Sequence, residues 1–142
     1  MTEPTSTLFV YGLLRSDMSA GLQRFVPGMA ALRGRASVAG RLYDLGDYPG
    51  LVLGDGNNDS DGGDGGGELV VGEVWGISDP AAWATLDAFE DVRADGTGQY
   101  RREAITVATA DGQRVLAQAY LYNRDPNRCH VVASGDWARR GA

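Results

Sequence analysis

The sequence predicts one α+β domain in which strands outnumber helices. Six segments carry apolar or β-prone runs between turn residues, and two segments repeat their apolar residues at helical spacing. The predicted strands cover residues 8–11, 35–45, 51–53, 69–77, 100–109 and 115–122, and the predicted helices cover residues 16–26 and 79–90. With 142 residues, of which 43% are hydrophobic, the chain can bury one core of ordinary size. Residues 1–142 are therefore interpreted as a single domain.

The first predicted strand, residues 8–11, stops abruptly at Gly12. A glycine permits a backbone conformation that a side chain would obstruct. The N–H groups of Leu13, Leu14 and Arg15 are therefore expected to converge on a carboxylate or a phosphate. The same strand, glycine and turn also occur as a purely structural junction in α/β domains, and this alternative stays open.

Three segments lack a regular pattern: a flexible arm at 1–6, an acidic glycine-rich loop at 54–68 and an irregular tail at 123–142. The loop at 54–68 is expected to be a mobile connection between two strands. It also allows a second hypothesis, because five of its residues match ligand or turn positions of a calcium-binding loop. These residues are Asn57, Asp59, Asp61, Gly62 and Glu68. The match is imperfect, since the first position is Asn and predicted strands flank the loop.

Glu90 is the candidate catalytic residue, at the end of the helix predicted for residues 79–90. Asp79 is the expected N-cap of this helix. At 100° per residue, Glu90 lies about 20° from Trp83 and about 40° from Leu86 around the helix axis. Its carboxylate therefore follows the buried stripe. Burial raises the pKa of a carboxyl group towards neutrality, as a general base or acid near pH 7 requires.

A second interpretation of Glu90 places its side chain in solvent or in an ion pair with a nearby arginine. The available arginines are Arg93, Arg101 and Arg102. The strand predicted for residues 115–122 bears on the same question, because alternation puts Tyr120 and Tyr122 on one face. One or both phenols are expected to face the space at the helix end. A glycine-bounded Tyr48-Pro49 pair is a further candidate for a pocket wall, although ordinary turns contain such pairs as well.

Composition excludes several classes of function. The net charge of −6 and the isoelectric point near 4.6 argue against nucleic acid or an anionic membrane as a partner. All 13 basic residues are arginine, which excludes Schiff-base chemistry on lysine and any P-loop lysine. Cys129 and His130 are the only residues of their types, and as neighbours in an extended segment they make a poor catalytic pair. A dedicated metal site is not expected.

No apolar run is long enough to cross a bilayer, and the first residues lack the features of a signal peptide. The expected compartment is the cytoplasm, which agrees with the single cysteine. The sequence leaves the oligomeric state open.

Six short motifs in the right order resemble the gamma-glutamylcyclotransferase superfamily, especially its short bacterial and gamma-glutamylamine cyclotransferase-like branch. Together they span roughly residues 7–123. The motifs are YGLLR at 11–15, GRLYDLG at 40–46 followed by Tyr48-Pro49, GEVW at 72–75, LDAFE at 86–90, YRR at 100–102 and AY at 119–120. The ordered set is specific to the superfamily, although it does not specify a substrate.

The resemblance implies a small, mostly antiparallel β-barrel-like sheet with flanking helices and a pocket at its mouth. It implies that backbone amides of Gly12, Leu13 and Leu14 hold the α-carboxylate of a gamma-glutamyl group, with Tyr11, Tyr48 and Tyr120 nearby. Glu90 matches the glutamate that moves a proton while the substrate's α-amine attacks its own γ-carbonyl and releases 5-oxoproline. No metal or cofactor is implied. The leaving group stays open: an amino acid, the remainder of glutathione, a lysine side-chain amine or a biosynthetic intermediate.

Two positions depart from the family pattern. Leu13 stands where the family often has Ser or Thr, and Asp91 stands where it usually has Gly. The added carboxylate is expected to raise the pKa of Glu90 further or to belong to a site altered for another use. The alternative function is therefore a catalytically idle relative that binds a small carboxylate metabolite or a partner protein.

Overall fold

The computed structural model describes most of the chain. The described residues are 6–12, 14–15, 22–46, 48–53, 69–126, 129–132 and 135–137. The calcium hypothesis for 57–68 and the predicted contacts of Leu13 lie outside them. So do residues 1–5 of the predicted arm and residues 16–21 of the first predicted helix.

The described part of the chain forms seven strands and two helices. In chain order they are β1 Thr7–Val10, α1 Leu22–Phe25, β2 Ala30–Asp44, β3 Pro49–Leu53, β4 Leu69–Ile77, α2 Ala81–Phe89, β5 Tyr100–Thr109, β6 Arg114–Tyr122 and β7 His130–Val131. The bounds of β4 and β5 are those predicted from the sequence. Strand β2 begins five residues earlier than predicted, because it continues through a bulge between Leu32 and Gly34 along β4.

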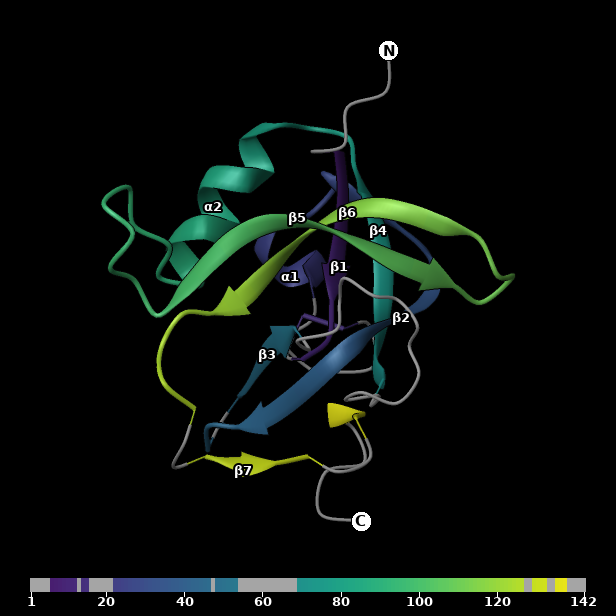
Figure 1. The fold of residues 1–142 in the computed structure, drawn as a ribbon. Helices are drawn as coiled ribbons and strands as arrows, with labels where there is room; N and C mark the ends of the chain where they lie inside the picture. The colour runs from purple at the N-terminus through teal and green to yellow at the C-terminus, as the bar shows by residue number, and fades with distance from the viewer. Residues whose placement is uncertain are drawn as a thin grey trace.

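Five of the strands close into a barrel (Figure 1). Each strand in the order β1, β4, β2, β3, β6 pairs with the next, and β6 pairs back to β1. The pairs β1 with β6 and β3 with β6 are parallel, and the other pairs of this ring are antiparallel. Strand β5 lies antiparallel to β6 along its whole length. The predicted barrel-like, mostly antiparallel sheet with flanking helices is confirmed.

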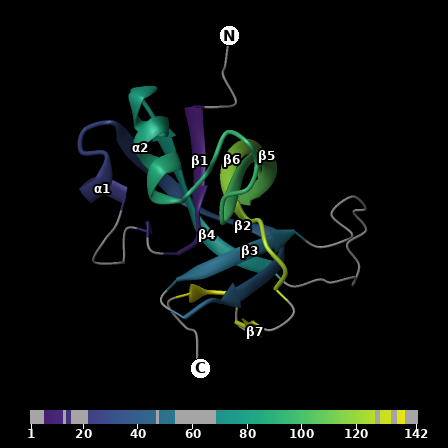
Figure 2. The same ribbon diagram turned by 90° about the vertical axis from the view of Figure 1, so that its left-hand side faces the viewer.

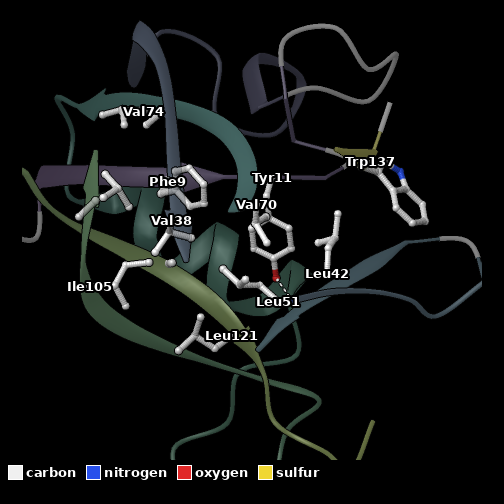
Figure 3. Close-up of a cluster of buried hydrophobic side chains, with 14 of the residues drawn as sticks. Phe9, Tyr11, Val38, Leu42, Leu51, Val70, Val74, Ile105, Leu121 and Trp137 are labelled. Carbon is white, nitrogen blue, oxygen red and sulfur yellow. Dashed lines mark hydrogen bonds between the residues drawn. The ribbon is translucent and has the colours of Figure 1, made fainter. Parts of the chain in front are cut away.

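Strand β1 separates two hydrophobic cores because its side chains alternate between the two faces of the barrel wall. Phe9 and Tyr11 belong to the core inside the barrel, which Figure 3 shows in close-up. Leu8 and Val10 belong to a second core beneath the helices, with Leu22 of α1 and Leu86 of α2. Both helices cover the same side of the barrel (Figure 2). Residues of both cores line one cavity at the boundary between them.

The tail predicted to be irregular, residues 123–142, contains one short strand among its described residues. The two-residue strand β7 pairs with the end of β2. Trp137 is 1% exposed and is part of the barrel core, and the carbonyl oxygen of Gly135 accepts a hydrogen bond from the Val71 N–H at 2.8 Å. The buried Trp137 side chain and backbone hydrogen bonds to β2 and β4 thus hold this segment against the barrel. None of the helices described has the length and apolarity to span a membrane.

Candidate functional site

An open cavity of about 280 Å³ lies where β1 ends, β3 and β5 begin, and α2 ends. Its walls are mostly apolar or phenolic, with one carboxyl group and one carboxamide. The lining residues are Phe9, Val10, Tyr11, Gly12, Leu14, Tyr48, Pro49, Phe89, Glu90, Gln99, Tyr100 and Tyr120. Six of the seven predicted site residues line this cavity, and Leu13, the seventh, lies outside the described residues.

Gly12 forms part of the cavity wall because the chain passes very close to it. A Cβ atom at this position would overlap the ring of Pro49. The predicted reason for this glycine was conformational freedom, yet Gly12 is not among the glycines with positive φ. Close approach of β3 is therefore the physical reason. Any larger residue at position 12 would push β3 and Tyr48 away from the cavity.

The turn after β1 differs in one respect from the predicted anion site. The Arg15 N–H donates to the carbonyl oxygen of Gly12 at 3.0 Å, so it closes the turn and does not point at a ligand. The Arg15 side chain is buried and forms an ion pair with Asp136, with 2.7 Å between Nη1 and Oδ1. Arg15 therefore anchors the turn to the C-terminal segment, and the amides of Gly12 and Leu14 are the candidate carboxylate donors among the described residues of the turn.

The end of helix α2 places Glu90 at the cavity through a Schellman motif. The Val92 N–H donates to the Asp87 carbonyl oxygen at 2.9 Å, and the Asp91 N–H donates to the Ala88 carbonyl oxygen at 3.2 Å. Asp91 occupies the left-handed position of the motif, with φ of 59°. Glycine is the common residue there because other residues are strained at positive φ. This explains physically why a glycine suits the position after the glutamate.

Burial raises the pKa of Glu90 from 4.5 to about 8, and no neighbouring charge contributes to this shift. The residue as a whole is half-buried, so its carboxyl group is largely desolvated while the cavity stays open. The predicted pairing with arginine does not occur. The candidate partners are engaged elsewhere: Arg93 with Asp91, Arg101 with Glu103 and Arg102 with Asp87.

Asp91 points away from the cavity, and its expected effect on Glu90 is not found. Its Oδ2 accepts the Gln99 N–H at 3.0 Å, and its Oδ1 accepts the Arg93 Nε–H at 3.0 Å. These two hydrogen bonds hold the pKa of Asp91 below its usual value. The prediction that Asp91 raises the pKa of Glu90 is therefore wrong, since burial alone accounts for that shift.

Three phenols of the cavity donate their hydroxyl hydrogens to protein acceptors. Tyr11 donates to the Tyr120 carbonyl oxygen, and Tyr100 donates to the Pro49 carbonyl oxygen. Tyr120 donates to Asp87 Oδ1 at 2.8 Å, which links β6 to the helix that carries Glu90. Burial raises the pKa of all three phenols. They therefore stay neutral at physiological pH and give the cavity rigid walls.

A fourth phenol, Tyr48, pairs with Gln99, a lining residue that the sequence analysis did not identify. The Gln99 Nε2–H donates to the Tyr48 hydroxyl at 3.0 Å. Tyr100 and Phe89 were missed as lining residues as well. Tyr100 starts the YRR motif and directly follows a polar loop. These two features predict that it is the first residue of a strand, which is where the structure has it. Phe89 precedes Glu90 but is 42% exposed, so helical spacing gave no signal for it.

No group of three His, Cys, Asp or Glu side chains close enough to hold a metal ion is found within the described ranges. Cys129 is half-buried and His130 is exposed on β7, away from the residues that line the cavity. The chemistry available at the cavity is therefore proton transfer by Glu90 and hydrogen bonding by phenols, the carboxamide and backbone amides.

Comparison with known proteins agrees with this geometry. Residues 8–139 match the family model described as gamma-glutamyl cyclotransferase, AIG2-like. The chain is 35% identical over 134 residues to the gamma-glutamylcyclotransferase family protein YtfP of Escherichia coli K12, covering 94% of this chain and 96% of YtfP. The solution structure of E. coli ytfP superimposes with a TM-score of 0.61 at 34% identity, covering 96% of this chain and 99% of that one.

The crystal structure of a mouse AIG2-like protein superimposes with a TM-score of 0.64 at 25% identity, covering 86% of this chain and 80% of the mouse chain. The family match covers both the barrel and the helix that carries Glu90. Agreement thus comes from the sequence and from the fold. The chain belongs to the gamma-glutamyl cyclotransferase, AIG2-like family.

Proposed function

We propose that this protein cleaves a gamma-glutamyl amide, amine or peptide by cyclisation and releases 5-oxoproline, with Glu90 as the general base and acid. The observation that carries the proposal is the desolvated Glu90 carboxyl group in a cavity with neutral walls. A group whose pKa is about 8 exchanges protons readily near neutral pH. Family membership supports the same class of reaction.

The proposed reaction needs no nucleophile from the protein. The substrate's α-amine nitrogen attacks the γ-carbonyl carbon, a five-membered ring closes, and the amide bond to the leaving amine breaks. Glu90 takes one proton from the α-amine and returns it to the leaving nitrogen, so its own protonation state is restored. Holding both reacting groups of one molecule in a folded conformation supplies a high effective molarity.

The walls of the cavity suit the proposed substrate. Backbone amides at residues 12–14 are the candidate donors for its α-carboxylate. The rings of Tyr11, Tyr100 and Tyr120 exclude water and have their hydroxyl hydrogens engaged with protein acceptors. Electrostatic interactions are stronger in such a site than in water.

The test measures 5-oxoproline release from gamma-glutamyl amines, gamma-glutamyl amino acids and glutathione. We expect release by the wild type and a loss of about 10²-fold to 10⁴-fold in kcat/KM for Glu90→Gln on the best substrate. Glu103→Gln is the matched control, because Glu103 is an exposed glutamate on β5 that does not line the cavity. The best substrate identifies the leaving group.

Full activity of Glu90→Gln would contradict the assignment of the general base. Absence of release from every substrate, with binding of small carboxylates retained, would favour the alternative function of a catalytically idle binding protein. In that case Leu13 and Asp91, the two departures from the family pattern, are the positions to restore first.

A further inference from the structure

The loop between α2 and β5 is fixed at Gln99 from both sides. The Gln99 N–H donates to Asp91 Oδ2 at 3.0 Å, and the Gln99 carbonyl oxygen accepts the Asn123 N–H at 2.8 Å. The Asn123 carboxamide also donates to the carbonyl oxygens of Gly96 and Gly98, each at 3.0 Å. Both backbone groups of Gln99 are thus held, which restricts the direction of its side chain.

Asp91 and Gly98 fit against one another at the base of this loop. A Cβ atom on Gly98 would overlap the carbonyl oxygen of Asp91, so the loop closes directly on the Schellman turn. The Asp91 carboxylate then reaches the Gln99 N–H across the closed loop. A glycine at position 91 would fit the backbone and would lack this acceptor. Asp91 therefore supplies a loop contact that the family's usual residue cannot supply.

The side chain of Gln99 lies in the cavity beside Tyr48, and both residues are half-buried. The Gln99 Nε2–H donates to the Tyr48 hydroxyl at 3.0 Å, and the Tyr48 O–H donates in turn to Gln99 Oε1 over a longer distance of 3.4 Å. The second Nε2–H of Gln99 stays a donor and the second lone pair of Oε1 stays an acceptor, so the carboxamide retains hydrogen-bonding capacity of both kinds. A donor beside an acceptor is complementary to a neutral amide, which has one C=O and at least one N–H.

The charges of the cavity favour an uncharged ligand at this pair. Of the described residues that line the cavity, none is an arginine, a lysine or a histidine. A carboxylate placed beside Tyr48 and Gln99 would have no counter-ion among the described side chains that line the cavity. A purely apolar group would leave the second Nε2–H and the second Oε1 lone pair of Gln99 unused, which also costs free energy.

We propose that Tyr48 and Gln99 form a specificity site for a leaving amine that carries a neutral amide, and that Asp91 is the positioning residue of this site. The inference rests on the proposed function for the identity of the gamma-glutamyl half of the ligand. The inference gives Asp91 a role in substrate selection. It therefore explains why Asp91 stands where the family usually has Gly, and it requires no effect of Asp91 on the pKa of Glu90.

The test compares three gamma-glutamyl conjugates whose leaving amines have the same shape: glycinamide, isobutylamine and glycine. Their affinities are measured by calorimetry on the Glu90→Gln protein, which is expected to bind the conjugates without consuming them. We expect the glycinamide conjugate to bind about tenfold more tightly than either of the others. Equal affinities, or no binding of any of the three, would overturn the proposal.

Three variants in the Glu90→Gln background test the positioning role. Gln99→Leu is expected to abolish the roughly tenfold preference, and Asp91→Gly to remove most of it. Asp91→Asn retains an acceptor for the Gln99 N–H and a side chain that tolerates positive φ, so the preference should survive. The melting temperature of Asp91→Gly should not fall, because glycine suits the backbone at this position.

A purely structural role of Asp91 would give a different result. In that case Asp91→Gly would weaken all three conjugates equally and lower the melting temperature, which would overturn the proposal. Release of 5-oxoproline is measured separately on the protein that retains Glu90. Selective binding of the glycinamide conjugate without release of 5-oxoproline would contradict the proposed function and would still support the proposed specificity site.

Discussion

The two sides of the C-terminal end of α2 carry adjacent carboxyl groups in opposite environments. Glu90 faces the cavity, where burial raises its pKa to about 8. Asp91 faces the loop, where hydrogen bonds from Gln99 and Arg93 lower its pKa. One left-handed residue in the Schellman motif turns the chain between them. Protonation behaviour here follows from the direction in which the backbone aims each side chain, and sequence proximity has little influence.

The largest expected effect comes from Glu90, which faces the cavity, and it concerns the pH dependence of catalysis. The proposed general base must be ionised, so kcat/KM should rise with pH through an apparent pKa of about 8. Below pH 8 it should fall about tenfold per unit, and so about a hundredfold by pH 6. Steady-state rates of 5-oxoproline release test this.

The substrate's α-amine also titrates at alkaline pH, so the Glu90 carboxyl group is followed independently. A ¹³C NMR titration of the free protein should give the same midpoint of about 8. A midpoint near 4.5, the ordinary value for a glutamate, would contradict the desolvation of this carboxyl group.

The second prediction concerns stability against pH. The folded protein binds the Glu90 proton more tightly than the unfolded chain, where the pKa is 4.5. The resulting stabilisation is fully present below pH 4.5 and is lost as the pH rises through about 8. Between pH 5 and pH 8 the free energy of unfolding should fall by about 2–3 kcal/mol more in the wild type than in Glu90→Gln, allowing for the half-buried position. Urea unfolding at several pH values measures the difference, and parallel curves would contradict it.

The third prediction tests the contact that joins α2 to the barrel. Tyr120→Phe removes the hydroxyl that donates to Asp87, three residues before Glu90. We expect unfolding to be easier by about 1 kcal/mol and kcat to fall by about tenfold, because Glu90 is held less firmly. Tyr122→Phe on the same strand is the control, since Tyr122 does not line the cavity. Equal effects of the two substitutions would argue against a specific role of Tyr120.

The smallest expected effect comes from a substitution of Asp91, which faces the loop between α2 and β5. Asp91→Asn removes a charge next to Glu90 in the sequence, yet the apparent pKa of Glu90 should stay where it is, because burial is the cause of its shift. The same NMR titration measures this. A clear downward shift of the Glu90 midpoint would show that the two carboxyl groups interact after all.

The sequence was a good guide to the helix that ends at Glu90. Helical spacing placed this carboxyl group on the buried stripe with Trp83 and Leu86, and the structure puts it in the cavity. Asp79 was predicted as the N-cap. The structure has Pro80 at the cap position, while Asp79 Oδ1 accepts the Ala81 N–H at 2.9 Å and so supplies the predicted acceptor. Local sequence patterns were sufficient here because the position of the Glu90 side chain depends on a single helix.

Contacts between distant segments could not be predicted in this way. The overlap that excludes a side chain at Gly12 comes from Pro49 on another strand. Gln99 enters the cavity because Asp91 and Asn123 hold its backbone, and no periodic pattern marks a loop residue of this kind. The ion pair between the buried Arg15 and the partly buried Asp136 joins the N-terminal and C-terminal parts of the described chain. In each case the partner lies on another element, which a local sequence pattern does not identify.

Closure of the barrel also has a kinetic consequence. Strand β1 pairs with β4 and β6, and the Tyr11 hydroxyl meets the Tyr120 carbonyl across a separation of 109 positions. Contacts between such remote segments form slowly, because the entropy of closing a long loop is lost before any contact is gained. The cavity walls from β1 and β6 therefore come together only when the barrel closes. Ligand binding should appear in the same slow phase of refolding as the native barrel, with no earlier intermediate able to bind.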